Sequence, residues 1–414
     1  MHSEKTHSVR ELLSTLKQKP FLLAFLMGFS SGMPFLLTSK TMQVWLKEAN
    51  VDLTVIGIFS MVALPYTLKF LWAPLIDRYQ FPFLGLRRGW LFVCQVFLGI
   101  LIGTMALINP AEHLWGFAVM ALLVSFFGAT QDVVVDAYRI ETLSRKDLGP
   151  ATALYMYGYK TSMLITGALA LVLADHISWR SVYIIMALVM ALTVSITFFA
   201  DEPKVRASHP ESLQQAVVNP FKEFLTRKYA VWILLFVVLY KVGDNMAANM
   251  LSPFYLDMGY SKTEIGIIAK LISPTMSWVG PVLGGFLVYS LGISGALWFA
   301  GVLQAASTFC FAILAWVPKN LWIYGAIISF EDVTAMIGNV AFVSFMSSSV
   351  NRQFTATQFA LLSGLAQIPR VIIAAPAGYF AKTLGWPPFF IFCALAAVPG
   401  LFLIFFFLRP RPQK

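Results

Sequence analysis

Long apolar runs, separated by short polar segments, make up most of the chain. Each run has roughly twenty residues, the length that an α-helix needs to cross about 30 Å of hydrocarbon. The composition indicates an integral membrane protein, because 58% of the 414 residues are hydrophobic, only 12% are charged and the mean hydropathy is +0.74. We predict twelve membrane-spanning helices, at about 21–45, 53–76, 90–108, from 114 through the string TQDVVVDAYR, 150–174, 181–200, 229–256, 262–288, 294–316, 320–348, 354–382 and 386–408.

The polar segment between the second and third runs fixes the predicted topology. Asp77 and Arg78 close the second helix, and Arg87 and Arg88 come just before the third. Because a short loop rich in arginine stays in the cytoplasm, we expect both chain ends of this multi-pass protein to be cytoplasmic. The net charge of +10 comes from such cytoplasmic segments, so it indicates orientation in the lipid bilayer and does not imply nucleic acid.

A polar segment at residues 201–228 is the longest in the chain and divides it into residues 1–200 and 229–414. We expect a cytoplasmic linker between two six-helix bundles. Two parallel six-helix repeats joined in this way form the major facilitator fold, an all-α membrane fold, and we predict that fold here. The halves align when shifted by 209 positions, which places Ile56-Gly57-Ile58 on Ile265-Gly266-Ile267, Thr54 on Thr263 and Pro65 on Pro274.

Charged residues inside the predicted helices are the strongest functional signal. Each would cost roughly 2.5 to 3.5 kcal/mol against lipid, so we expect all of them to face protein or water. They fall on the first, second, fourth, fifth, seventh, eighth, tenth and eleventh helices, which surround the central cavity of the facilitator fold. Structural ion pairs between helices remain an alternative for each residue. The set comprises Lys40, Lys69, Lys160, Lys241, Lys270, Arg370, Asp132, Asp136, Asp244, Glu331 and Asp332.

Several of these residues have spacings that predict a role. Lys241 and Asp244 are three positions apart on one helix and can form an ion pair. Asp132, Asp136 and Arg139 share a helix face, which predicts either a gate with the basic loop or a simple salt bridge at the helix end. As candidates for proton coupling or gating we select Asp132, Asp136, Asp244, Glu331, Lys69, Asp77 and Arg78.

A cavity with several cations suits a substrate that carries carboxylates, and amide or phenol groups would bond its hydroxyl and amide groups. We therefore select a set of candidate substrate-binding residues. These are Lys40, Lys160, Lys241, Lys270, Gln367, Arg370, Tyr240 and Asn249.

The energy source is expected to be a proton gradient. The nearest string to a phosphate-binding loop, GYKTS at Gly158, lacks the required spacing. The three cysteines lie singly in separate apolar runs, and the five histidines lie in loops or termini, so we expect neither a metal nor another cofactor. A membrane carboxylate is the remaining proton carrier, and Asp244, Asp132 and Glu331 all qualify.

The sequence also resembles the AmpG muropeptide permeases of Gram-negative inner membranes. The resemblance implies proton-coupled import of anhydromuropeptides, which are GlcNAc-anhydroMurNAc peptides, from periplasm to cytoplasm by alternating access for peptidoglycan recycling. It further implies an influence on β-lactamase induction, and we expect a monomer. The strings that carry it span residues 28–400 and are GFSSGMPFLLTS, KFLWAPLIDRY with GLRRGW, QDVVVDAYR, SLQQAVVNPF, VLYKVGD, FTATQFALLS and AAVPG.

Two alternatives have different consequences. The first keeps the fold and changes the anionic solute to a siderophore, an acyl-CoA-like anion or a drug. The second is a membrane enzyme for lipid-linked sugars with Asp132 and Asp136 as an acid/base pair. Because the carboxylates are spread over several helices without a metal-binding cluster, we expect a transporter and not an enzyme.

Overall fold

The computed structural model describes residues 18–203, 213–268, 272–368 and 376–407. Helices are the regular elements in these ranges, together with one isolated bridge between Phe81 and Gly85. The predicted all-α membrane fold is therefore confirmed for the part of the chain that the structure describes.

The first half of the chain folds into helices α2 to α12. They are α2 (Lys19–Leu37), α3 (Lys40–Glu48), α4 (Leu53–Ile58), η1 (Phe59–Ala63), α5 (Leu64–Leu68), η2 (Lys69–Leu71), α6 (Ala73–Arg78), α7 (Arg87–Leu107), α8 (Leu114–Thr142), α9 (Leu148–Met163), η3 (Leu164–Leu169), α10 (Ala170–Ala174), α11 (Trp179–Leu192) and α12 (Val194–Phe199).

The second half follows after α13 (Leu213–Leu225), a helix in the predicted linker. Its helices are α14 (Ala230–Leu239), α15 (Val242–Asp257), α16 (Lys262–Ile267), α17 (Ser273–Trp316), α18 (Leu321–Ser349), η5 (Arg352–Phe354), α19 (Thr355–Leu365), α20 (Ala377–Leu384), α21 (Trp386–Ala396) and α22 (Val398–Phe407).

Within the described ranges, ten helical segments are long and apolar enough to cross a membrane. One of them, α17, has 44 residues and would be about 66 Å long if straight, more than twice the length of one crossing. Gly292 bends it with a φ of 70°, so α17 contains the predicted ninth crossing and most of the predicted eighth, whose first residues form α16. The eleventh is formed by α19 and α20 on either side of residues 369–375, which gives the twelve crossings of the prediction.

The second crossing is less regular than predicted. We expected one helix over residues 53–76, whereas the structure has three short α-helices that alternate with two 3-10 turns. Pro65 and Pro74 each lie in the first turn of one of the α-helical pieces. Proline has no N–H for the helix hydrogen bonds, so it is tolerated in the first turn of a helix but interrupts a continuous one.

The two halves repeat one another in structure. Helices α4 and α16 each have six residues and begin 209 positions apart, the shift found in the sequence. Each is capped by the side chain before it, since Asp52 accepts from the Thr54 amide and Ser261 from the Glu264 amide. Hydrogen bonds to Asp52 from the Thr54 side chain and from the Thr54 amide hold the pKa of Asp52 below its usual value. Helices α8 and α18 both have 29 residues and lie 207 positions apart.

In each half, a tryptophan of the last crossing donates a hydrogen bond to a carboxylate of the first crossing. Trp179 Nε1 donates to Glu48 Oε2 at 2.7 Å, and Trp386 Nε1 donates to Asp257 Oδ2 at 3.0 Å. The tryptophans are 207 positions apart and the carboxylates 209 apart. Each half thus closes its bundle with the same bond.

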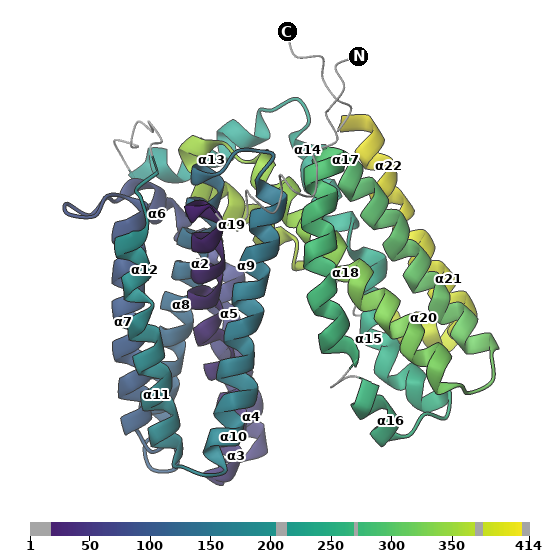
Figure 1. Cartoon of the computed structure of the whole chain (residues 1–414), viewed down its shortest axis with the longest axis horizontal. Helices are drawn as coiled ribbons and strands as arrows, with labels where there is room; N and C mark the ends of the chain where they lie inside the picture. The colour runs from purple at the N-terminus through teal and green to yellow at the C-terminus, as the bar shows by residue number, and fades with distance from the viewer. Residues whose placement is uncertain (1–17, 204–212, 269–271, 369–375, 408–414) are drawn as a thin grey trace.

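The halves form two groups of helices that stand side by side (Figure 1). Helices α6, α13 and the start of α2 lie at one end of the molecule, which we call the linker face, and Lys19 pairs there with Asp201 at 2.6 Å. The two groups approach each other at the linker face and diverge towards the opposite end. Contacts between the halves are therefore concentrated near the linker.

Glycines let the first and fifth crossings pack closely. A Cβ at Gly28 would overlap the Tyr155 carbonyl, and a Cβ at Gly158 would overlap the Phe25 carbonyl. The GxxxG spacing of Gly28 and Gly32 predicts such an approach. Close packing of the two helices therefore accounts for Gly28 and Gly158.

We expect Gly28→Ala to lower the free energy of unfolding by about 1–3 kcal/mol, because an extra methyl group must displace the α9 backbone. Thermal unfolding of the purified protein in detergent measures the effect. Gly116→Ala is the matched control, since a Cβ there has open space around it. Equal melting temperatures for the two variants would contradict the packing argument.

Candidate functional site

An ion pair and the hydrogen bonds around it join four crossings of the first half. Lys69 on η2 pairs with Asp132 Oδ2 on α8. The other oxygen of Asp132 accepts from Ser31 Oγ on α2 at 3.0 Å and from the Tyr155 hydroxyl on α9 at 2.9 Å. We call these four residues the N-half cluster. They come from the first, second, fourth and fifth crossings, the set predicted to surround the central path.

Asp136 lies one turn beyond Asp132 but has a different environment. Its carboxylate accepts from Arg139 Nη2 at 2.9 Å within the same helix, and Arg139 also donates to Thr152 on α9. The arginine side chain is 2% exposed and lies over the Tyr155 ring. Of the two predicted alternatives, the structure favours a salt bridge within α8 for Asp136 over a gate with the basic loop.

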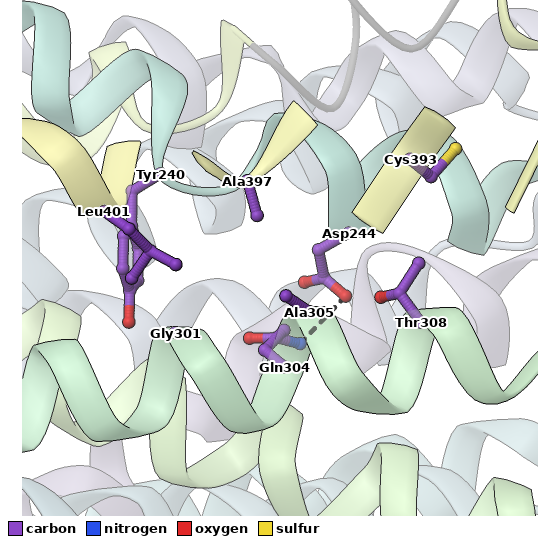
Figure 2. Close-up of a pocket in the computed structure, with 9 residues that line it drawn as sticks. All are labelled: Tyr240, Asp244, Gly301, Gln304, Ala305, Thr308, Cys393, Ala397 and Leu401. Atoms are coloured by element: carbon purple, nitrogen blue, oxygen red, sulfur yellow. Dashed lines mark hydrogen bonds between the residues drawn. The ribbon is translucent and has the colours of Figure 1, made fainter. Parts of the chain in front are cut away.

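In the second half, Lys241, Asp244 and Gln304 form a closed ring of bonds. Lys241 Nζ lies 3.3 Å from Asp244 Oδ2 and donates to Gln304 Oε1 at 3.0 Å. Gln304 Nε2 completes the ring by donating to Asp244 Oδ1 at 2.9 Å, as Figure 2 shows. The predicted pairing of Lys241 with Asp244 is confirmed. We call these three residues the C-half ring.

Sequence reasoning missed Gln304, because it is uncharged and lies on the ninth crossing, where we saw no charge to satisfy. A cavity of about 10 Å³ adjoins it, bordered by Asp244, Thr308 and Cys393 (Figure 2). A space of this size holds about one water molecule. The C-half ring therefore faces the interior of its own bundle on this side.

Glu331 lies close to the C-half ring on α18. Its carboxylate accepts from Ser307 Oγ, and Ser307 accepts from Thr334 Oγ1 at 3.0 Å. Among the described residues no cation lies within ion-pair distance of Glu331. The adjacent Asp332 has a buried Oδ2 without a hydrogen-bond partner in the described ranges. The two neighbouring acids therefore have separate environments.

At the linker face the two halves are joined through Asp77 and Arg87. Arg87, which is 2% exposed, pairs with Asp77 at 2.7 Å and with Glu141 at 2.6 Å. Asp77 belongs to the first half and accepts from the amides of Ala356 and Thr357 at 3.1 and 2.8 Å in the second. These amides open α19, where the helix dipole favours a negative charge. Asp77 thus caps a helix of the opposite half.

The linker helix strengthens this junction. Gln358 on α19 donates to the Pro220 carbonyl at 3.0 Å and to Glu223 at 2.6 Å, and Arg227 pairs with Glu223 at 2.7 Å. Burial raises the pKa of Glu223, but bonds from Arg227 and Gln358 outweigh it, so the pKa lies below its usual value. The start of α19 is therefore held by Asp77 on one side and by α13 on the other.

Further contacts between the halves run along α9 and α17. Lys160 Nζ donates to the Ser277 carbonyl at 2.7 Å, and Tyr157 donates to the Trp278 carbonyl and packs against its ring at 5.3 Å between centroids. Lys160 was predicted to bind substrate. In this conformation it joins the two halves.

The remaining predicted residues are dispersed. Lys40, Asn249 and Gln367 have exposed side chains, and Arg78 lies over the Tyr79 ring. Tyr240 is buried, donates to the Leu297 carbonyl at 3.0 Å and stacks on Phe342, which is a packing role. Lys270 and Arg370 lie outside the described residues.

Two repeats of six crossings, with ionic clusters between their helices, make up the major facilitator fold. Solved structures share this fold at low identity. FucP in its outward conformation matches with a TM-score of 0.72 and 13% identity over 96% of this chain and 99% of its own. The proton:xylose symporter XylE matches with a TM-score of 0.68 and 11% identity over 97% of each chain.

Sequence comparison gives the same fold class and also identifies the family within it. The model of the Major Facilitator Superfamily matches residues 20–374. The anhydromuropeptide permease of Escherichia coli strain K12 is 38% identical over 95% of this chain and 81% of its own length. The chain belongs to the AmpG permease family of the Major Facilitator Superfamily.

We expect Asp77→Asn to loosen the linker face, because the variant removes the charge that pairs with Arg87 and caps α19. Loss of one partner of a buried ion pair costs about 3 kcal/mol. Spin labels at the exposed positions Phe83 and Lys228 should show a longer distance in this variant. Asp175→Asn is the control, because Asp175 lies in the exposed turn directly after α10, and α10 lies near the opposite end (Figure 1). Identical distance distributions in both variants would show that Asp77 does not hold the halves together.

Proposed function

We propose that this protein imports anhydromuropeptides, the GlcNAc-anhydroMurNAc peptides released from peptidoglycan, from the periplasm to the cytoplasm for recycling. The observation that carries the proposal is 38% identity to a named anhydromuropeptide permease over 95% of the chain. Transport of this substrate would influence β-lactamase induction in species that have the circuit. We take the monomer as the functional unit.

The proposed orientation places the linker face in the cytoplasm of the bacterial inner membrane, with both termini on that side. At this face Arg87 and Arg88 begin α7, and Arg145 and Lys146 lie between α8 and α9. Basic residues concentrate in cytoplasmic loops. On this basis residues 1–200 and 229–414 form the two moving bundles and residues 201–228 the cytoplasmic linker.

Alternating access follows from two bundles that rock against each other around a site between them. The Asp77 cap on α19 and the α9 to α17 contacts support assigning this conformation as closed to the cytoplasm. For the substrate to leave on that side, these contacts must break. Lys160 would then lose the Ser277 carbonyl and become available to a carboxylate of the muropeptide.

Candidate substrate contacts divide into two groups. Lys40, Asn249 and Gln367 have exposed side chains and are proposed to meet the substrate first. The N-half cluster combines a cation, a carboxylate and two hydroxyl groups, a set that can bond sugar hydroxyls and peptide carboxylates. Lys270 and Arg370 remain proposals from the sequence.

Among the carboxylates, Glu331 is our first choice for the proton carrier. Asp132 and Asp244 each pair with a lysine, so protonating either one breaks an ion pair. The Glu331 carboxylate accepts from the hydroxyl group of Ser307, and no lysine or arginine is within ion-pair distance among the residues described. It can therefore gain or lose a proton at a smaller cost in lost interactions. Its proximity to the C-half ring would couple that change to Lys241.

The deciding experiment is uptake of a labelled anhydromuropeptide into proteoliposomes, with an imposed proton gradient and with the gradient collapsed. We expect gradient-driven uptake by the wild type. In Glu331→Gln, uptake should fall to the level without a gradient, while exchange of labelled for unlabelled substrate continues, because the variant resembles a permanently protonated carrier.

Asp175→Asn serves as the control and should behave as the wild type. Loss of both uptake and exchange in Glu331→Gln would assign this residue to substrate binding or folding instead. If the wild type shows no uptake although it is correctly folded, the muropeptide assignment fails. Competition by a siderophore, an acyl-CoA-like anion or a drug in the same assay would then identify another anionic substrate.

A further inference from the structure

A second pocket lies at the linker face, away from both ionic clusters. Its volume is about 340 Å³, and residues of both halves line it, among them Arg145 between α8 and α9 and Arg352 between α18 and α19. Small-molecule sites begin at about 300 Å³. The pocket is therefore large enough for a compact ligand.

The two arginines occupy equivalent positions in the repeat, 207 residues apart. Each reaches across to the other half. Arg145 Nη2 donates to the Ser348 carbonyl at 3.4 Å, and Arg352 Nη2 donates to the Leu143 carbonyl at 2.7 Å. These reciprocal bonds place two guanidinium groups on one pocket, and they do so only while the halves are in contact at this face.

The residues that line this pocket offer many hydrogen-bond donors. A guanidinium carries five N–H groups, and the bonds of each arginine to the carbonyls across the pocket use only its Nη2 atom. Asn351 accepts from the Gln353 amide through Oδ1, and its side chain also hydrogen-bonds the Glu223 carboxylate, which lies outside the lining and pairs with Arg227. No carboxylate is found among the described lining residues, and the nearby Asp147 accepts from Ser144 at 2.6 Å. A pocket with two cations and no acid favours an anion.

We propose that this pocket binds a phosphate group, supplied either by a small phosphorylated metabolite or by the headgroup of an anionic lipid. A phosphate has three oxygens that can accept from two guanidinium groups at once, and arginine matches this geometry well. A ligand that contacts both halves binds only the conformation in which they meet. It therefore shifts the population towards the form closed at the linker face.

The binding test uses the full chain in nanodiscs of zwitterionic lipid, with pyrophosphate as the probe and sodium chloride at matched ionic strength as the blank. Pyrophosphate should raise the melting temperature of the wild type by about 2 °C once it is well above its Kd. The rise should disappear in Arg145→Gln and in Arg352→Gln. Lys146→Gln, an exposed neighbour outside the pocket lining, should keep it.

Nanodiscs that contain phosphatidylglycerol distinguish the two sources of phosphate. If the lipid abolishes the pyrophosphate effect in the wild type, the headgroup occupies the pocket; if the effect persists, a soluble anion is the ligand. An equal rise in the arginine variants, or no rise in the wild type in zwitterionic lipid, would overturn the proposal. The melting temperature of each variant without pyrophosphate shows that it has folded.

The consequence for transport rests on the proposed function. Pyrophosphate on the linker-face side of proteoliposomes should slow muropeptide uptake by the wild type and not by the arginine variants. Undiminished uptake while the melting temperature still rises would remove the regulatory role. Absence of any uptake would count against the proposed function alone, because the binding measurement does not depend on it.

Discussion

Charge inside an apolar medium is the constraint on which this structure depends. A charged group facing lipid costs several kcal/mol, so each buried charge requires a partner on another helix or in the next turn. The chain meets this requirement with compact clusters. Asp132 pairs with Lys69 and accepts hydrogen bonds from Ser31 and Tyr155. Asp244 pairs with Lys241 and accepts a hydrogen bond from Gln304. The same bonds that make the charges tolerable also determine which helices stay together.

Contacts within a half and contacts between halves are built differently. Within a half, the close packing at Gly28 and Gly158 and the bonds from tryptophan to carboxylate join crossings of the same repeat, so rocking of the bundles leaves them in place. Between the halves, Asp77, Lys160 and the linker helix mostly bond to backbone groups or to single side chains. Such bonds can be exchanged for water when the linker face opens.

Sequence reasoning succeeded where spacing along one helix was enough, and it failed where partners are distant. The hydrophobic pattern located the crossings, and the three-residue spacing predicted the bond between Lys241 and Asp244. Gln304 was missed because a neutral amide carries no signal in a search for charges. Arg87 and Glu141 lie 54 positions apart, and only the packing of α7 against α8 reveals that they meet. The second crossing is divided into short helices at Pro65 and Pro74. Whether a proline interrupts a membrane helix depends on the helices packed around it, and the sequence alone does not show these.

The cap that Asp77 places on α19 at the linker face occurs in one direction only, although the two halves of the molecule repeat each other. Asp77 in the first half caps α19 of the second, but the position 209 residues later is Phe286, an apolar residue within α17, and α9 begins without a side-chain cap. One carboxylate therefore performs a task that an unmodified duplication would have given to two. Among the described residues this junction therefore has no symmetry-related duplicate that could compensate for the loss of Asp77.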